Sequence, residues 1–162
     1  MAVALLSSAA LLPAAPFAFR SNDRVALVGN TVIERAQRFG HVETLLSLSA
    51  GAGAKGLTFR NIGWSGDSVF GDARSYFGAP KEGRERLQRV VKEVQPTVLM
   101  VCYGTNAAMT SAKGWTDDPA GSARSKAGDE QGLKLFVETY GKLLDLMVAG
   151  AGAGLREGIL IS

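Results

Sequence analysis

A chain of 162 residues, 46% of them apolar and 20% charged, is long enough for one compact domain with its own core and too short for two. The net charge of +3 comes from lysines and arginines scattered among acidic residues, so the sequence lacks the basic stripe of a protein that binds nucleic acid or anionic membranes. The single cysteine, Cys102, excludes an intrachain disulfide and a cysteine metal site, and we interpret it as a small buried hydrophobic residue.

The first twenty residues, MAVALLSSAALLPAAPFAFR, form an alanine-rich apolar stretch that differs from the rest of the chain. The stretch is too short and too interrupted by proline for a stable membrane span. It resembles a secretory signal peptide with small residues near Ala15 to Ala18 as cleavage sites, although positive charges at its start are missing. We expect export to the periplasm or the extracellular space, with a disordered leader or a misassigned start as the alternatives, and we leave residues 1–20 out of the predicted domain.

From residue 24 onward, segments typical of strands and helices alternate. Apolar runs predict strands, and apolar residues at helical spacing predict helices, with Pro96 ending the second helix. The predicted strands are 24–29, 56–63, 97–104 and 158–162, and the predicted helices are 31–50, 82–95 and 130–150.

This alternation predicts an α/β fold with three layers, in which helices cover both faces of a parallel sheet. Ligands of such sheets bind beyond the carboxyl ends of the strands, which selects the loops after Gly29, Gly63 and Gly104. The chain stops at its fourth predicted strand, which would leave apolar surface open. We therefore expect a truncated fold, with residues 24–162 as the N-terminal portion of a longer domain.

Two glycine-rich segments do not fit a phosphate-binding site. GAGAKG at 51–56 matches the spacing of a dinucleotide-binding loop, but it follows a predicted helix instead of opening one. AGAGAG at 149–154 also follows a helix. Both are interpreted as connectors at helix ends.

The three selected loops read VGNTVIER (28–35), NIGWSGDSVFGD (61–72) and YGTNAAM (103–109). Together they resemble the SGNH hydrolases, the superfamily that contains the GDSL esterases, and the resemblance covers residues 24–162. It implies a flavodoxin-like fold and ester hydrolysis by a serine in a Gly-Asp-Ser turn. In this alignment Gly29-Asn30-Thr31 occupies that turn. The second block, Asn-x-Gly-x-x-Gly, falls on Asn61, Gly63 and Gly66, and Gly104-Thr105-Asn106 fits the third block.

A literal Gly-Asp-Ser occurs at residues 66–68, yet we do not expect Ser68 to be the nucleophile. That choice would leave the strand, turn and helix around residues 24–37 unexplained. It would also leave no glycine loop between Ser68 and the Gly-x-Asn block.

The resemblance implies three donors to a developing oxyanion: the backbone N–H groups of Thr31 and Gly66, and the side chain of Asn106. Thr31 takes the nucleophile position, but its methyl group crowds the attacking oxygen. An equally open interpretation is that Asn30 and Thr31 only cap the following helix. Otherwise Asn30 is a candidate substrate-binding residue.

The family's Asp-x-x-His block, which supplies the base, does not occur in these 162 residues. The only histidine, His41, lies about three helical turns beyond Thr31, so we do not expect it to act as the base. The long polar segment 110–131 contains Trp115, a candidate substrate-binding residue that could stack on a sugar ring. The alternative is that Trp115 covers an edge of the core.

The resemblance thus implies a carboxyl-ester hydrolase for small acyl esters such as acetyl groups on carbohydrate, with a chain that is inactive alone. The alternative is a non-catalytic module that binds a carbohydrate or another ligand on a degenerate SGNH fold. We expect no metal and no organic cofactor. The sequence does not indicate an oligomeric state.

Overall fold

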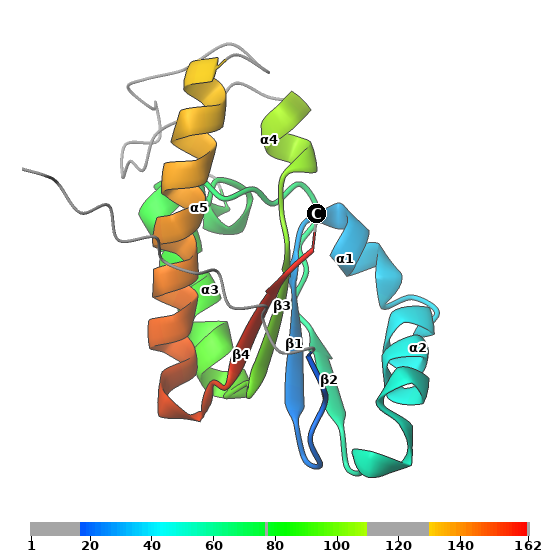
Figure 1. Ribbon diagram of the computed structural model, residues 1–162. Helices are drawn as coiled ribbons and strands as arrows, with labels where there is room; N and C mark the ends of the chain where they lie inside the picture. Colours follow the sequence, from blue (N-terminus) through cyan, green and yellow to red (C-terminus); the bar gives the residue numbers. More distant parts are fainter. Residues whose placement is uncertain (1–16, 77, 110–129, 162) are drawn as a thin grey trace, which may run out of the picture.

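A computed structural model describes residues 17–76, 78–109 and 130–161, which form a four-stranded parallel sheet between two layers of helices (Figure 1). The strand order is β2-β1-β3-β4. The strands are β1 (Arg24–Gly29), β2 (Thr58–Asn61), β3 (Val98–Cys102) and β4 (Glu157–Leu160). The helices are α1 (Thr31–Ala36), α2 (His41–Ala50), α3 (Pro80–Val94), α4 (Thr105–Met109) and α5 (Glu130–Ala151). The predicted α/β class with a parallel sheet is confirmed.

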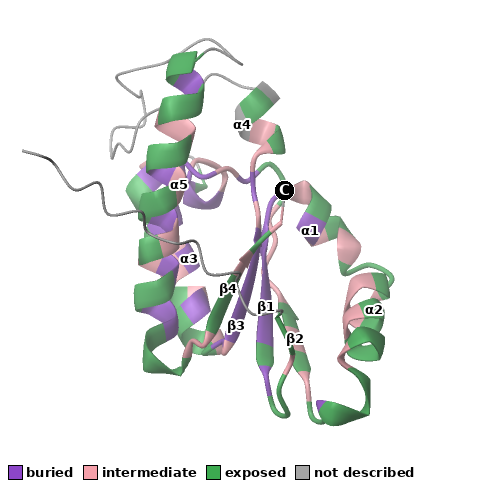
Figure 2. Ribbon diagram, viewed as in Figure 1, coloured by how far each residue is buried: buried purple, intermediate pink, exposed green. Residues whose placement is uncertain are grey.

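The two central strands are buried on both faces, which explains why they read as continuous apolar runs (Figure 2). Alternate residues of β1 face opposite layers, because side chains of a strand point to the two faces in turn. Ala26 and Val28 join one core cluster, and Val25 and Leu27 join the other.

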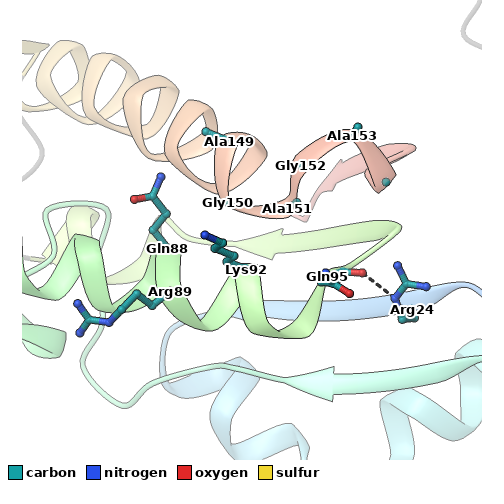
Figure 3. A pocket seen from close by; sticks show the side chains of 11 residues that line it. Arg24, Gln88, Arg89, Lys92, Gln95, Ala149, Gly150, Ala151, Gly152 and Ala153 are labelled. Atoms are coloured by element: carbon teal, nitrogen blue, oxygen red, sulfur yellow. Dashed lines mark hydrogen bonds between the residues drawn. The ribbon is translucent and has the colours of Figure 1, made fainter.

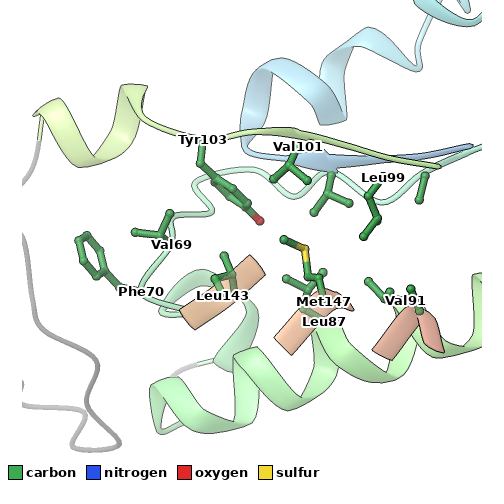
Figure 4. Close-up of a cluster of buried hydrophobic side chains, with 12 residues drawn as sticks. Val69, Phe70, Leu87, Val91, Leu99, Val101, Tyr103, Leu143 and Met147 are labelled. Carbon is green, nitrogen blue, oxygen red and sulfur yellow. The ribbon is translucent and has the colours of Figure 1, made fainter. Parts of the chain in front are cut away.

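Helices α3 and α5 cover one face of the sheet, and α1 and α2 cover the other (Figure 1). The larger cluster lies under α3 and α5, where Leu87, Val91, Leu143 and Met147 meet the side chains of β3 (Figure 4). Helix α3 begins at Pro80, two residues before the predicted start. Its C-cap, Gln95, adopts a left-handed conformation directly before Pro96.

The prediction of one helix over 31–50 is wrong, because the chain breaks into α1 and α2 at Gly40. Gly40 has a φ of 63°, a left-handed conformation that a continuous helix does not contain and that glycine adopts without strain. The short helix α4 was not predicted. Both glycine-rich segments are connectors as predicted, since each contains a 3₁₀ turn at a helix end, at Gly51–Gly53 and Gly152–Gly154.

The last residues of the stretch that the sequence analysis left out of the domain contact the folded chain. Phe19 packs against the smaller core cluster, and Nη2 of Arg156 donates a hydrogen bond to the carbonyl of Ala18. Residues 17–20 therefore belong with the domain, and residues 1–16 lie outside the described part. Cys102 is half-buried instead of fully buried. None of the described helices is long and apolar enough to cross a membrane.

Candidate functional site

The carboxyl ends of β1, β2 and β3 lie at the same rim of the sheet (Figure 1). Gly29 at the end of β1 pairs with Cys102 at the end of β3, and Leu27 pairs with Asn61 at the end of β2. The loops after these strands therefore start from nearly the same level. This is the position at which parallel sheets bind their ligands.

Thr31 is the first residue of α1, and its side chain faces the second loop. Its Oγ1 accepts a hydrogen bond of 2.9 Å from the backbone N–H of Gly66. Asn30, the residue before it, is 2% exposed and caps the helix, because its Oδ1 accepts the N–H of Val32 at 3.0 Å. The capping interpretation thus describes the contacts of Asn30, whereas the Thr31 hydroxyl lies at the rim.

The second loop sits directly on the first turn of α1. Nδ2 of Asn61 donates to the carbonyl of Ile33 at 2.6 Å, and its Oδ1 accepts the N–H of Gly63 at 3.0 Å. A side chain at Gly63 would collide with the backbone of Glu34. The Asn-x-Gly spacing of this block therefore has a packing reason: only a residue without Cβ lets the loop approach the helix this closely.

Asn106 brings the third loop to the same place. It lies on α4, and its Nδ2 donates a hydrogen bond of 2.9 Å to the carbonyl of Asp67, the residue after Gly66. The three residues predicted to share a site, Thr31, Gly66 and Asn106, thus lie at one rim. Thr31 binds the N–H of Gly66, and Asn106 binds the carbonyl of the next residue, Asp67.

A buried polar cluster beneath these residues was missed by the sequence analysis. Oδ2 of Asp67 accepts hydrogen bonds from Nε of Arg74 and from the hydroxyl of Tyr103, both at 2.6 Å. Asp67 is 1% exposed and Arg74 4% exposed. Charged side chains are rarely buried so completely unless they are paired, but 36 residues separate Asp67 from Tyr103, and no local pattern predicts that pairing.

Burial shifts the pKa values of the ionisable groups in this cluster. It raises the pKa of Asp67 above its ordinary value, while Arg74 and the Tyr103 hydroxyl act in the opposite direction. Burial and the neighbouring Asp67 carboxylate together raise the pKa of Tyr103 well above its ordinary value. The Tyr103 hydroxyl therefore stays protonated near neutral pH and remains a hydrogen-bond donor.

The other residues considered at the sequence level lie elsewhere or outside the described residues. Ser68 is half-buried, and its Oγ accepts the N–H of Phe70 at 3.2 Å. His41 is exposed at the start of α2, where it stacks on Phe39. Trp115 falls in segment 110–129, which is not described. The described residues contain no group of three or more His, Cys, Asp or Glu that could hold a metal ion.

A cavity of about 640 Å³ lies at the opposite rim, between the C-terminal ends of α3 and α5 (Figure 3). Its cationic lining residues are Arg24, Arg89 and Lys92. Figure 3 shows these side chains pointing in different directions, and Nε of Arg24 is bound to the carbonyl of Gln95 at 2.7 Å. The lining therefore has no point on which its positive charges converge.

Comparison with known proteins identifies the fold. No family model and no curated protein matches the sequence. Among solved structures, an acetyl xylan esterase from Geobacillus stearothermophilus matches over 88% of this chain and 60% of its own, with a TM-score of 0.52 and 17% identity. This chain shares the α/β fold of that esterase. An α/β hydrolase from the metagenome of Lake Arreo, Spain, matches over 88% of this chain and 61% of its own, with a TM-score of 0.49 and 18% identity.

At 17% identity, the likeness to the esterase shows the fold and not the reaction. The chain also spans only 60% of the length of that esterase.

Proposed function

We propose that this chain carries the nucleophile position and the oxyanion donors of a carboxyl-ester hydrolase that acts on small acyl esters. Acetyl groups on carbohydrate are the substrate class we favour, because the matched esterase removes acetyl groups from xylan. The observation that carries the proposal is the hydrogen bond from N–H of Gly66 to Oγ1 of Thr31. The side-chain amide of Asn106 lies beside it, because its Nδ2 donates to the carbonyl of Asp67, the residue after Gly66. A hydroxyl and two N–H donors from three separate loops thus lie at one rim.

In the proposed reaction, Oγ1 of Thr31 attacks the ester carbonyl carbon and its proton passes to a base. The carbonyl oxygen becomes an oxyanion, which accepts hydrogen bonds from Gly66 N–H and Asn106 Nδ2. The ester C–O bond then breaks, the alcohol leaves with the proton from the base, and water releases the acyl group from Thr31 as the carboxylic acid. Donors fixed in advance at this position stabilise the transition state more than the substrate. His41 lies on α2, so we propose that the base comes from residues outside these 162.

Asn106→Ala tests the role of the side-chain donor. We expect kcat for p-nitrophenyl acetate to fall by roughly a hundred- to a thousandfold, because one oxyanion donor is lost. The measurement is the release of p-nitrophenol by the parent and by the variant, each made in the longer protein that carries the proposed base. Gln37→Ala is the control, since it removes an exposed amide at the end of α1. Equal rates in the two variants would rule out Asn106 as an oxyanion donor.

The nucleophile position is tested by covalent labelling. Treatment with a fluorophosphonate should modify Thr31, and peptide mass spectrometry identifies the site. Thr31→Ala should abolish the label, and Thr31→Ser should retain it because serine keeps the hydroxyl without the crowding methyl group. Labelling at Ser68 in place of Thr31 would contradict the proposal.

The alternative function, a non-catalytic ligand-binding module, is supported by one contact. Gly66 N–H already donates to Thr31, so an incoming oxyanion has to displace the hydroxyl from that donor. Binding of acetylated xylan oligomers that persists in Thr31→Ala, without turnover by the parent, would favour this alternative.

A further inference from the structure

We propose that Asp67, whose carboxylate accepts hydrogen bonds from Arg74 and Tyr103, is a positioning residue. It fixes Gly66 N–H and Asn106 Nδ2 relative to each other. Its kinetic consequence rests on the hydrolase function proposed above. The contacts on which it depends are present whatever the reaction.

Asp67 is held at its backbone and at its side chain. Its N–H donates to the carbonyl of Trp64 at 3.0 Å, and its own carbonyl accepts Nδ2 of Asn106 at 2.9 Å. Its carboxylate takes the two 2.6 Å hydrogen bonds from Arg74 and Tyr103. Short charge-assisted bonds of this kind are about twice as strong as bonds between neutral groups. Asp67, which follows Gly66 and accepts the Asn106 amide, is therefore anchored from the core.

Gly66 depends on this anchor because its Cβ position is unpacked. It is exposed, its φ is 75°, and no heavy atom of the described residues lies within 4 Å of the place where its Cβ would be. An unpacked glycine has wide conformational freedom. Its N–H, which belongs to the Ser65–Gly66 peptide unit, is held by Thr31. The next residue, Asp67, is held from the core and limits how far the chain at Gly66 can move.

Arg74 ties the start of the second loop to the same point. Its Nη2 donates to the carbonyl of Ile62 at 2.7 Å while Nε holds Asp67, so one guanidinium spans residues 62–67. The guanidinium also lies over the ring of Trp64, 5.6 Å from its centroid. A lysine could not make both hydrogen bonds with the same geometry, because its charge is a single point on a flexible stem.

Tyr103 connects this loop to the third one. It follows β3 directly and stands three residues before Asn106. Within this segment, the Tyr103 hydroxyl donates to the carboxylate of Asp67, and the Asn106 amide donates to the carbonyl of Asp67. The second and third loops are thereby locked together, and the two donors belong to one rigid unit. A misplacement of about 1 Å between such groups costs roughly a hundredfold in rate.

If this cluster only stabilised the fold, hydrophobic residues would serve as well. Burying an ion pair carries a large desolvation cost, and well-packed hydrophobic residues of similar volume often stabilise a protein equally well or better. Directional hydrogen bonds provide what hydrophobic packing does not, namely a fixed orientation for the peptide units at the rim.

The test compares two variants that each lose one phenol hydroxyl near β3. Tyr103→Phe removes the hydrogen bond to Asp67. Tyr140→Phe removes a 3.5 Å contact with the carbonyl of Val101, and its ring lies 6.1 Å from that of Tyr103. We expect Tyr103→Phe to lower kcat for p-nitrophenyl acetate by roughly ten- to a hundredfold with little change in KM. Tyr140→Phe should leave both parameters near the parent values.

A second measurement does not depend on turnover. Nitrogen-15 NMR spectra report on Gly66 N–H and on the Asn106 side-chain amide in the parent and both variants. In Tyr103→Phe both signals should shift, and the amide protons should exchange with deuterium about tenfold faster as the local opening becomes easier. In Tyr140→Phe they should match the parent.

The outcomes separate the two proposals. If the parent has no turnover but only Tyr103→Phe moves the two NMR signals, the hydrolase function fails and the positioning role stands. If the parent turns over and the two variants match each other in kcat and in NMR, the positioning role is overturned and the hydrolase function stands. Shifts of equal size in both variants would also overturn it, since they reflect general loosening of the core.

Discussion

The contact between the second loop and α1 depends on a residue that has no side chain. Gly63 lies against the backbone of Ile33 and Glu34, so a Cβ at this position would have to displace the first turn of α1. Thr31, the nucleophile position, begins that same turn. The fit between Gly63 and the helix therefore sets the distance between Thr31 and the Gly66 donor.

Gly63→Ala should lower the free energy of unfolding by about 1–3 kcal/mol, because overpacking against a helix backbone cannot be relieved by moving a flexible side chain. Gly53→Ala is the matched control, since Gly53 is exposed and a Cβ there would meet no atom of residues 17–76, 78–109 or 130–161 within 4 Å. The control should stay within about 0.5 kcal/mol of the parent. Urea denaturation followed by circular dichroism measures both, and equal stabilities would show that the loop can move away from α1.

At the level of elements, the break between α1 and α2 distinguishes the observed fold from the predicted one. The apolar periodicity over 31–50 continues across Gly40, so it predicts one helix. If that helix were continuous, replacing a central glycine by alanine would stabilise it by roughly 0.5–1 kcal/mol. The left-handed conformation of Gly40 reverses the sign of this expectation.

Gly40→Ala should destabilise the protein by about 1–2 kcal/mol, because alanine is strained at a φ of 63°. Gly141→Ala should stabilise it by roughly 0.5–1 kcal/mol, because Gly141 lies in the interior of α5 and is exposed, and its Cβ position has no neighbour within 4 Å in the part of the chain that the structure describes. Thermal unfolding of the two variants gives both signs in one experiment. A stabilising Gly40→Ala would mean that α1 and α2 join in solution.

What could be predicted from the sequence is what local patterns encode. The apolar runs of β1 and β3 located the two buried strands, and the glycines and Asn106 in the loops after the strands located the rim. What was missed depends on contacts between distant segments. No local sequence pattern predicts the hydrogen bonds of Arg74 and Tyr103 to Asp67. The same holds for the packing of Phe19 against the sheet. The break at Gly40 could have been suspected only from the glycine itself.

At the scale of the whole molecule, Asp23 joins the amino ends of all four strands. It directly precedes β1, and its carbonyl accepts the N–H of Thr58 at the start of β2. Its carboxylate accepts the hydroxyl of Thr97, just before β3, at 2.8 Å and Nη2 of Arg156, just before β4, at 2.5 Å. The carboxylate also accepts the N–H of Arg20 at 2.7 Å. One buried residue thus fixes the end of the sheet opposite the candidate site, with its carbonyl holding β2 and its carboxylate holding the starts of β3 and β4.

Asp23 should make the stability of the protein depend on pH. Burial alone would raise the pKa of this carboxyl, but the hydrogen bonds from Arg20, Thr97 and Arg156 outweigh it and hold the pKa below its ordinary value. The unfolded chain therefore binds a proton at a higher pH than the folded chain does. The stabilisation is fully present above the ordinary aspartate pKa of about 3.9 and is lost as the pH falls through the lower pKa of the folded state.

Asp23→Asn keeps the shape of the side chain but removes its charge. We expect it to lower the free energy of unfolding by about 2 kcal/mol near neutral pH, the range for a hydrogen bond to a charged group. The difference between parent and variant should shrink once the pH drops below about 4, because protonated Asp23 has the same charge as asparagine. Urea denaturation of both proteins across this range measures the difference. A gap that stays constant down to the lowest accessible pH would show that the charge of Asp23 does not cause the difference, and any pH dependence of stability would then have to come from other carboxylates.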